Sequence, residues 1–207
     1  NLLNLFPKLT EASQKNVKEF VETHKENGVT LEKYLPACVK LPYLFNCKPN
    51  YHEKNILGTV EKFKKQGLTY KIYLDACLKQ PSLFSMHPNT VEKNLTQTID
   101  FFKNNGLTTD NYIKSCIKHP TLFAHSSETI KKNVTGLIEK FKDEGLTINK
   151  YLKACLKQPA LFYLSPETLE KNINQTIKKF SPNGLKTEDY LKACLKASEL
   201  FYRNPDS

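Results

Sequence analysis

The stretch GLTINKYLKACLKQPALFYLSPETLEKNINQTIKKFSPN, residues 145–183, decides the fold, because the rest of the chain repeats it with changes. It is 39 residues long, and this interval relates corresponding residues along the chain without insertion or deletion. A fixed period of this length predicts a solenoid, in which each repeat buries its apolar face against its neighbours. The register is kept by Cys38, Cys77, Cys116, Cys155 and Cys194, by Tyr34, Tyr73, Tyr112, Tyr151 and Tyr190, and by Gly28, Gly67, Gly106, Gly145 and Gly184.

The first half of each repeat predicts a helix of roughly 10 residues. Thr147 stands where an N-cap is expected, and Pro159 ends the helix. Between them the apolar residues recur on one stripe, formed by Tyr151, Leu152, Cys155 and Leu156. The dipeptide Leu161-Phe162 supplies apolar mass to the connection that follows. We expect the tyrosine and Leu-Phe positions to form the core of every repeat.

The second half of each repeat predicts a helix of roughly 15 residues. Ser165-Pro166-Glu167 combines an oxygen cap, a proline in the first turn and an acid near the positive end of the helix dipole. The apolar face consists of Leu169, Ile173, Thr176, Ile177 and Phe180. A glycine such as Gly67 then follows, where a left-handed C-terminal cap needs a residue without Cβ.

The fold class is therefore all-α, an α-solenoid of 39-residue two-helix repeats whose superhelix is right- or left-handed. We expect one array over residues 1–207, with partial repeats at 1–27 and 184–207 and full repeats at 28–66, 67–105, 106–144 and 145–183. Residues 204–207 have the form of another second-helix start, which suggests a piece of a longer array. The last repeat departs from the pattern at Lys186 and Ser198.

The cysteines favour a reducing compartment. Equivalent cysteines of stacked repeats lie about 10 Å apart, beyond the roughly 7 Å limit for bridging two Cα atoms. We expect free thiols and an intracellular location: a bacterial cytoplasm, an organelle matrix or the interior of a host cell. No apolar run approaches the roughly 18 residues of a membrane span, so we expect no membrane association. We also expect a monomer.

The sequence contains no catalytic constellation, and we expect neither an enzyme nor a cofactor. The residues closest to a metal site are Cys116, His119 and His125, but Cys116 occupies a core position and Pro120 ends the helix between them. The repeated glycines stand singly at helix ends, so they form no phosphate-binding loop. We therefore predict no metal ion and no bound cofactor.

The charge of the chain is more informative about a ligand than the search for a catalytic or metal site. The formal net charge is +10, and Arg203 is the one basic residue that is not lysine. Such a surface neutralises phosphates without reading a base sequence. Two lysine columns keep the repeat register and are our candidate nucleic-acid-binding residues: Lys40, Lys79, Lys118, Lys157 and Lys196 at the end of the first helix, and Lys15, Lys54, Lys93, Lys132 and Lys171 on the second helix.

Other readings of the repeated polar positions stay open. Lysine near a helix C-terminus is favoured by the helix dipole without any ligand, and lysine is common on solvated helices. The residues Gln80, His119 and Gln158, which precede the repeat prolines, are candidates for reading base edges. The asparagines Asn16, Asn55, Asn94, Asn133 and Asn172 lie at the border of the apolar stripe, where we expect them to tie one repeat to the next by amide hydrogen bonds.

The repeat resembles that of the mitochondrial transcription termination factor (mTERF) family. The resemblance is carried by a helix, the motif Pro-x-Leu-Phe, a second-helix start and a glycine that closes the unit. It spans essentially the whole chain, with Pro42, Pro81, Pro120 and Pro159 before the Leu-Phe pairs and Pro49, Pro88 and Pro166 at the second-helix starts. It implies a curved array that binds double-stranded nucleic acid along a basic groove, in organellar or bacterium-like genetic systems.

Two functions follow from these observations. The first is a nucleic-acid-binding solenoid that holds duplex DNA, or RNA, through lysine–phosphate contacts along a concave groove. The second is a protein-interaction scaffold for an acidic partner, such as a secreted effector of an intracellular bacterium, because the repeats are unusually alike. Salt-dependent, saturable binding of nucleic acid distinguishes the two.

Overall fold

The computed structural model describes residues 2–203, and no strand occurs among them. The predicted continuation of a second helix at residues 204–207 lies outside the described residues. The chain divides into two compact units, residues 1–93 and 94–207, and each is described by itself. Their boundary falls inside the helix α5, and the single array over residues 1–207 stays a prediction.

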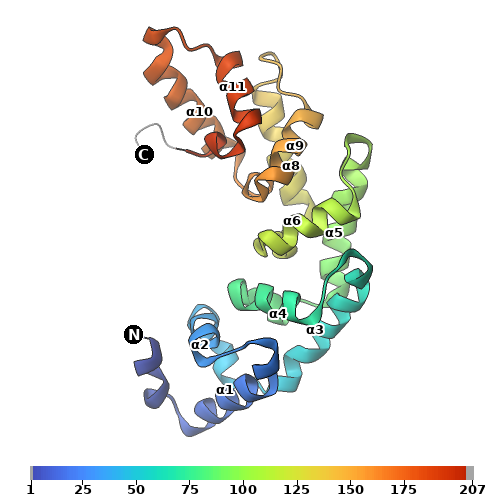
Figure 1. The fold of residues 1–207 in the computed structure, drawn as a ribbon, viewed down its shortest axis with the longest axis vertical. Coiled ribbons are helices and arrows are strands. Elements are labelled where there is room, and N and C mark those ends of the chain that lie inside the picture. The colour runs from blue at the N-terminus through green and yellow to red at the C-terminus, as the bar shows by residue number, and fades with distance from the viewer. Residues whose placement is uncertain (1, 204–207) are drawn as a thin grey trace. The chain divides into compact units, whose positions relative to one another are not determined.

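The two helices of each predicted repeat are present with the expected lengths (Figure 1). The first helices have 10 residues each and are α2 (Leu31–Lys40), α4 (Tyr70–Lys79), α6 (Thr109–Lys118), α9 (Ile148–Lys157) and α11 (Thr187–Lys196). The second helices have 14 or 15 residues and are α1 (Glu11–His24), α3 (Pro49–Phe63), α5 (Pro88–Phe102), α8 (Ser127–Lys140) and α10 (Pro166–Phe180).

Short helices form the connections between the longer helices. The sequence predicted only that these connections hold an apolar Leu-Phe pair or end at a glycine. The proline and Leu-Phe segments are η1 (Leu2–Lys8), η3 (Pro42–Asn46), η5 (Pro81–Ser85), α7 (Thr121–Ala124), η7 (Pro159–Phe162) and η9 (Ser198–Phe201). A further 3-10 turn follows four of the second helices, at η2 (Lys25–Asn27), η4 (Lys64–Gln66), η6 (Lys103–Asn105) and η8 (Ser181–Asn183). These turns tighten the chain before four of the five glycine caps.

The predicted caps are largely confirmed. The glycine after each second-helix segment has a positive φ, between 79° at Gly28 and 92° at Gly106, which a residue with a Cβ rarely adopts. Ser165 accepts a hydrogen bond from the Thr168 amide at the start of α10. Thr147 holds the N-cap position of α9, but its side chain makes no capping bond.

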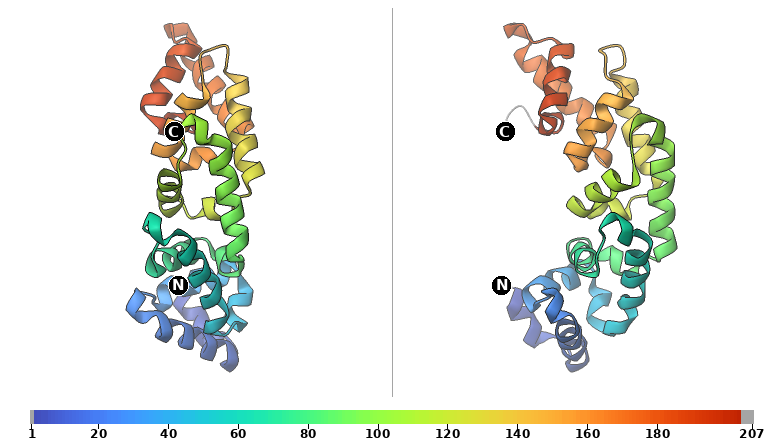
Figure 2. Two further views of the ribbon diagram at one scale, coloured as in Figure 1. Left: turned by 90° about the vertical axis from the view of Figure 1, so that its right-hand side faces the viewer. Right: turned by 45° about the vertical axis from the view of Figure 1, so that its right-hand side comes forward.

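The helices of each unit form two layers, which the two views of Figure 2 also show. In the first unit α2 packs against α4, and α1 packs against α3. In the second unit α9 packs against both α6 and α11, and α8 packs against α10. First helices therefore adjoin first helices, and second helices adjoin second helices, as a solenoid requires.

The core of each unit is built from the residues that keep the repeat register. The repeat tyrosines are at most 7% exposed, and the five cysteines of the column are fully buried. All six cysteines are free thiols, as predicted. Burial raises the pKa of Cys116 and of Cys155 well above its usual range, so these thiols stay protonated and pack as small apolar groups.

Candidate functional site

The five lysines of the first column occupy one structural position. Each is the last residue of its first helix, and all five are exposed: Lys40, Lys79, Lys118, Lys157 and Lys196. Within residues 2–203 none of the five forms an ion pair or donates a side-chain hydrogen bond. Their ammonium groups are therefore available to an external anion, and the nearby helix C-terminus also favours them.

The first helices of the second unit carry further lysines on the same exposed face. Lys114 precedes the column by one turn in α6, as Lys153 does in α9 and Lys192 does in α11. Residues three or four apart share a helix face, so these lysines and the column residues point the same way. Lys150 adds a third lysine to α9, which gives seven exposed lysines on α6, α9 and α11. We call these seven residues the first-layer lysine face.

A hollow of about 350 Å³ lies on this face between α9 and α11. Lys150, Lys153 and Lys157 line one side, and Leu156 and Leu195 complete the lining. A cationic rim over an apolar floor suits a ligand with negative charge on an organic body. The hollow thus places three of the seven lysines around a single recess.

Two of the seven lysines are partly engaged by the protein itself. Lys150 donates to the carbonyl oxygen of Gly145 at 3.0 Å, and Lys192 lies 3.3 Å from Asp189. Both also line a neighbouring hollow of about 270 Å³, where Asp143, Glu144 and Glu188 bring negative charge. The positive charge is therefore concentrated toward the C-terminal ends of α6, α9 and α11.

The first helices of the first unit are less basic. The positions equivalent to Lys114 and Lys153 hold Pro36 in α2 and Asp75 in α4. Lys33, which corresponds to Lys150, donates to the carbonyl oxygen of Gly28 at 2.6 Å. The lysine column alone continues through this unit.

The lysines of the second column lie in the other layer, on the second helices. Lys15 pairs with Glu19 at 3.9 Å on α1. All five residues are exposed: Lys15, Lys54, Lys93, Lys132 and Lys171. Because the two columns belong to different helix layers, a ligand on one layer is contacted chiefly by one column.

The chain holds a third lysine column, which is not among the residues predicted above. Lys25, Lys64, Lys103 and Lys142 follow the second helices at the repeat interval. Three of them pair with an acid three residues earlier: Lys25 with Glu22, Lys64 with Glu61, and Lys142 with Glu139. The i, i+3 spacing of acid and lysine could have revealed these pairs. Their charge is compensated locally, so this column is a weaker candidate for binding anions.

The candidate readout residues Gln80, His119 and Gln158 are the C-cap residues of α4, α6 and α9. Gln80 donates to the hydroxyl of Ser82 at 3.0 Å, and Gln158 donates to the hydroxyl of Tyr202 at 2.7 Å. The ring of His119 lies 6.4 Å from that of Tyr163, and burial lowers its pKa. The half-buried side chains of His119 and Gln158 thus meet residues of the following repeat, and their role in reading bases stays a prediction.

The asparagine column ties neighbouring repeats together, as the sequence indicated. In each described contact the side-chain amide donates to a backbone carbonyl 29 or 30 residues ahead, in the Leu-Phe segment or directly after it. The pairs are Asn16 with Phe45, Asn55 with Phe84, Asn133 with Tyr163 and Asn172 with Tyr202, at 3.0 to 3.3 Å. These asparagines are therefore structural.

The described residues offer no cluster of three or more His, Cys, Asp or Glu side chains that could hold a metal ion. Cys116 is fully buried, and the ring of His125 stacks on Tyr163 at 5.3 Å. In the part of the chain that the structure describes, no helix combines the length and apolar character of a membrane span.

The repeat pattern and the helical layers agree with a known protein family. The family model mTERF matches residues 1–203 of the chain. No curated protein matches the chain.

Proposed function

Because this chain belongs to the mTERF family of helical repeat proteins, which generally bind nucleic acid, we propose that it holds duplex DNA, or an RNA duplex, through lysine–phosphate contacts. The contacts come from the first-layer lysine face and from the rest of the first lysine column. The family is non-enzymatic, and we propose a binding function for this chain as well. Its location is an intracellular, reducing compartment, in keeping with six free thiols.

The observation that carries the proposal is the packing of α6, α9 and α11 side by side, with seven exposed lysines on their common face. A duplex presents one negative charge per about 1.7 Å of its axis, so adjoining helices with repeated cations match it over several phosphates. Lysine acts as a point charge and lacks the planar fork with which arginine reads guanine. The binding should therefore depend weakly on base sequence.

The test is fluorescence anisotropy of labelled duplex DNA, duplex RNA and single-stranded DNA over a series of salt concentrations. With four or five phosphate contacts, the plot of log affinity against log salt should have a slope of about −4 to −5. The variant Lys118→Ala, Lys157→Ala, Lys196→Ala removes three of these contacts. Its slope should be shallower by about 2.7, since each phosphate contact contributes about 0.9.

The matched control is Lys25→Ala, Lys64→Ala, Lys142→Ala, which removes the same formal charge from locally paired lysines. Its salt slope should stay close to that of the unchanged chain. A slope near zero for the unchanged chain, or equal losses in both triple variants, would refute the assignment to the first layer. Absence of binding at low salt, with helical circular dichroism intact, would favour the protein-interaction scaffold.

A further inference from the structure

A separate hollow of about 900 Å³ lies in the first unit, on the layer of second helices. It runs along α3 from the loop residue Cys47 to Lys62 and is bordered by the start of α5 at His87 and Asn89. Its volume lies in the range of sites that hold a small organic ligand. No lysine of the first-layer lysine face takes part in it.

The lining of this hollow is cationic. Lys48, Lys54 and Lys62 contribute ammonium groups, and no described residue of the lining is acidic. Lys62 is engaged by Glu92 at 2.5 Å, which leaves Lys48 and Lys54 as the groups that can attract an anion. Both of these side chains are exposed.

Tyr51 gives the same hollow an aromatic surface. Its side chain is 64% exposed, more than any other large apolar or aromatic residue in the described part of the chain. The Tyr51 and His52 rings are nearly perpendicular, with the two ring centroids 5.3 Å apart. An exposed ring beside lysines is the arrangement on which proteins stack nucleobases while they hold the phosphates.

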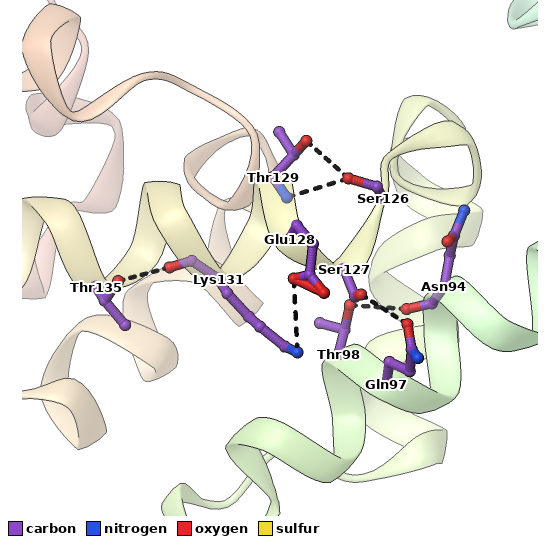
Figure 3. A network of polar contacts seen from close by, with 9 residues as sticks. All are labelled: Asn94, Gln97, Thr98, Ser126, Ser127, Glu128, Thr129, Lys131 and Thr135. Carbon is purple, nitrogen blue, oxygen red and sulfur yellow. Dashed lines mark hydrogen bonds and ion pairs between the residues drawn. The ribbon is translucent and has the colours of Figure 1, made fainter.

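Two other second helices, α8 and α10, hold a capping pair at this position. At the start of α8 the Ser126 hydroxyl accepts from the Thr129 amide at 3.1 Å and contacts the Thr129 hydroxyl at 2.9 Å, as Figure 3 shows. The start of α10 repeats this contact with Ser165 and Thr168. In α3 the two equivalent positions hold Lys48 and Tyr51, and Lys48 makes no side-chain cap. A capping pair has been exchanged for a cation and an exposed ring.

We propose that this hollow binds an unpaired nucleotide, whose base stacks on Tyr51 and whose phosphate meets Lys48 and Lys54. The side-chain amides of Asn50 and Asn89, which also line the hollow, donate and accept hydrogen bonds to base edges. The ligand is either a free nucleotide or a nucleotide of a single strand, since both present the same base and phosphate. The site is independent of the proposed duplex contacts, because it uses other residues on another helix layer.

The experiment is isothermal titration of the chain with ATP, adenosine, inorganic tripolyphosphate and a short single-stranded oligoadenylate. The key variant is Lys48→Ser, Tyr51→Thr, which recreates the capping pair of α8 and α10 and should fold at least as well as the unchanged chain. It should weaken binding of ATP and of the oligonucleotide about tenfold or more. Tripolyphosphate and adenosine should each bind more weakly than ATP, because each provides one half of the interaction.

The variant Lys25→Ala, Lys64→Ala, Lys142→Ala, whose lysines are paired locally, serves as the matched control and should bind ATP as the unchanged chain does. Tighter binding of the oligonucleotide than of ATP identifies a strand as the natural ligand, and the reverse order identifies a free nucleotide. The proposal fails when no probe gives saturable binding, when tripolyphosphate binds as tightly as ATP, or when the double variant keeps full affinity. None of these failures bears on duplex binding.

Discussion

Replacement of Asn133 by alanine should destabilise the second unit, because this side chain joins α8 to the following repeat. Asn133 is 7% exposed, and its amide donates to the carbonyl oxygen of Tyr163 at 3.0 Å. The contact spans 30 residues of sequence, so it acts between two repeats and not within a helix. Alanine removes the donor and leaves the carbonyl of Tyr163 without this partner.

The cost follows from the two parts of the change. A hydrogen bond of this kind contributes about 0.5–1.5 kcal/mol net, and a buried acceptor left without a partner costs about 1–3 kcal/mol. We expect a loss of about 2 kcal/mol in the free energy of unfolding. For a chain of this length that loss corresponds to a fall in Tm of about 4–8 °C.

The assay is urea and thermal unfolding followed by circular dichroism at a helical band. Asn133→Asp is the sharper variant, because the carboxylate keeps the shape of the side chain but cannot donate to a carbonyl. It should cost at least as much as the alanine variant. Asn174→Ala, at an exposed position on α10, should change stability by less than about 0.5 kcal/mol. Equal stability of Asn133→Asp and the unchanged chain would refute the reasoning.

Three further predictions concern positions whose surroundings are known. Lowering the pH from about 7.5 to about 5.5 should lower Tm, since burial lowers the pKa of His24 and of His52 below the usual 6.5. The unfolded chain then binds more protons than the folded chain, so stability is lost as the pH falls through about 6.5. In thermal scans the variant His52→Asn should show a weaker dependence of Tm on pH. Gly136→Ala should cost about 1–3 kcal/mol in urea unfolding, because a Cβ there would lie 2.8 Å from Cγ of Pro166, and Pro166→Ser should relieve the loss. Gly67→Ala should cost about 1–2 kcal/mol in the same assay, because its φ is +85° although no atom lies within 4 Å of the added Cβ.

The helices could be predicted from the sequence because each carries its own signals. The apolar stripe of Tyr151, Leu152 and Cys155 is buried as expected, and the proline after it ends the helix. The contacts between repeats could not be predicted from the sequence, except for those of the asparagine column. Lys140 meets Glu170 at 2.7 Å, 30 residues ahead, as Lys62 meets Glu92, but the repeat between them holds Phe101 in place of the lysine, so the pair keeps no strict register. Such a pair depends on how two second helices cross, which is a property of the assembled layers.

The same distance of 30 residues links side chains that compensate one another. Gly136 has no side chain and so leaves room for Pro166. One repeat earlier the equivalent residues are Gln97 and Ser127, and Gln97 accepts a hydrogen bond from Ser127 at 2.9 Å (Figure 3). Phe101 and Lys140 occupy equivalent positions in neighbouring repeats. Nζ of Lys131 lies over the Phe101 ring, 5.1 Å from its centroid, whereas Lys140 forms an ion pair with the carboxylate of Glu170. These pairs vary together from repeat to repeat, so their variation requires no external ligand.

The candidate site was predicted in part. A search for positions that recur in every repeat finds Lys118, Lys157 and Lys196, but it passes over Lys114 and Lys153, whose counterparts in the first unit are not lysine. A binding surface forms from helices that adjoin in space, and it needs no strict repetition along the whole chain. The charge of the individual helices is the signal that could have found it.

The helix dipole alone does not account for the first-layer lysine face. The dipole favours a cation within the last turn of a helix, and the column residues Lys118, Lys157 and Lys196 are the only basic residues there in α6, α9 and α11. Lys114, Lys153 and Lys192 lie one turn earlier, beyond the reach of that effect. Of these three, Lys192 has an acid nearby, but within residues 2–203 Lys114 and Lys153 form no ion pair. Two unpaired lysines on adjoining helices repel each other in the free chain, and the attraction of a bound polyanion for both lysines would offset that repulsion.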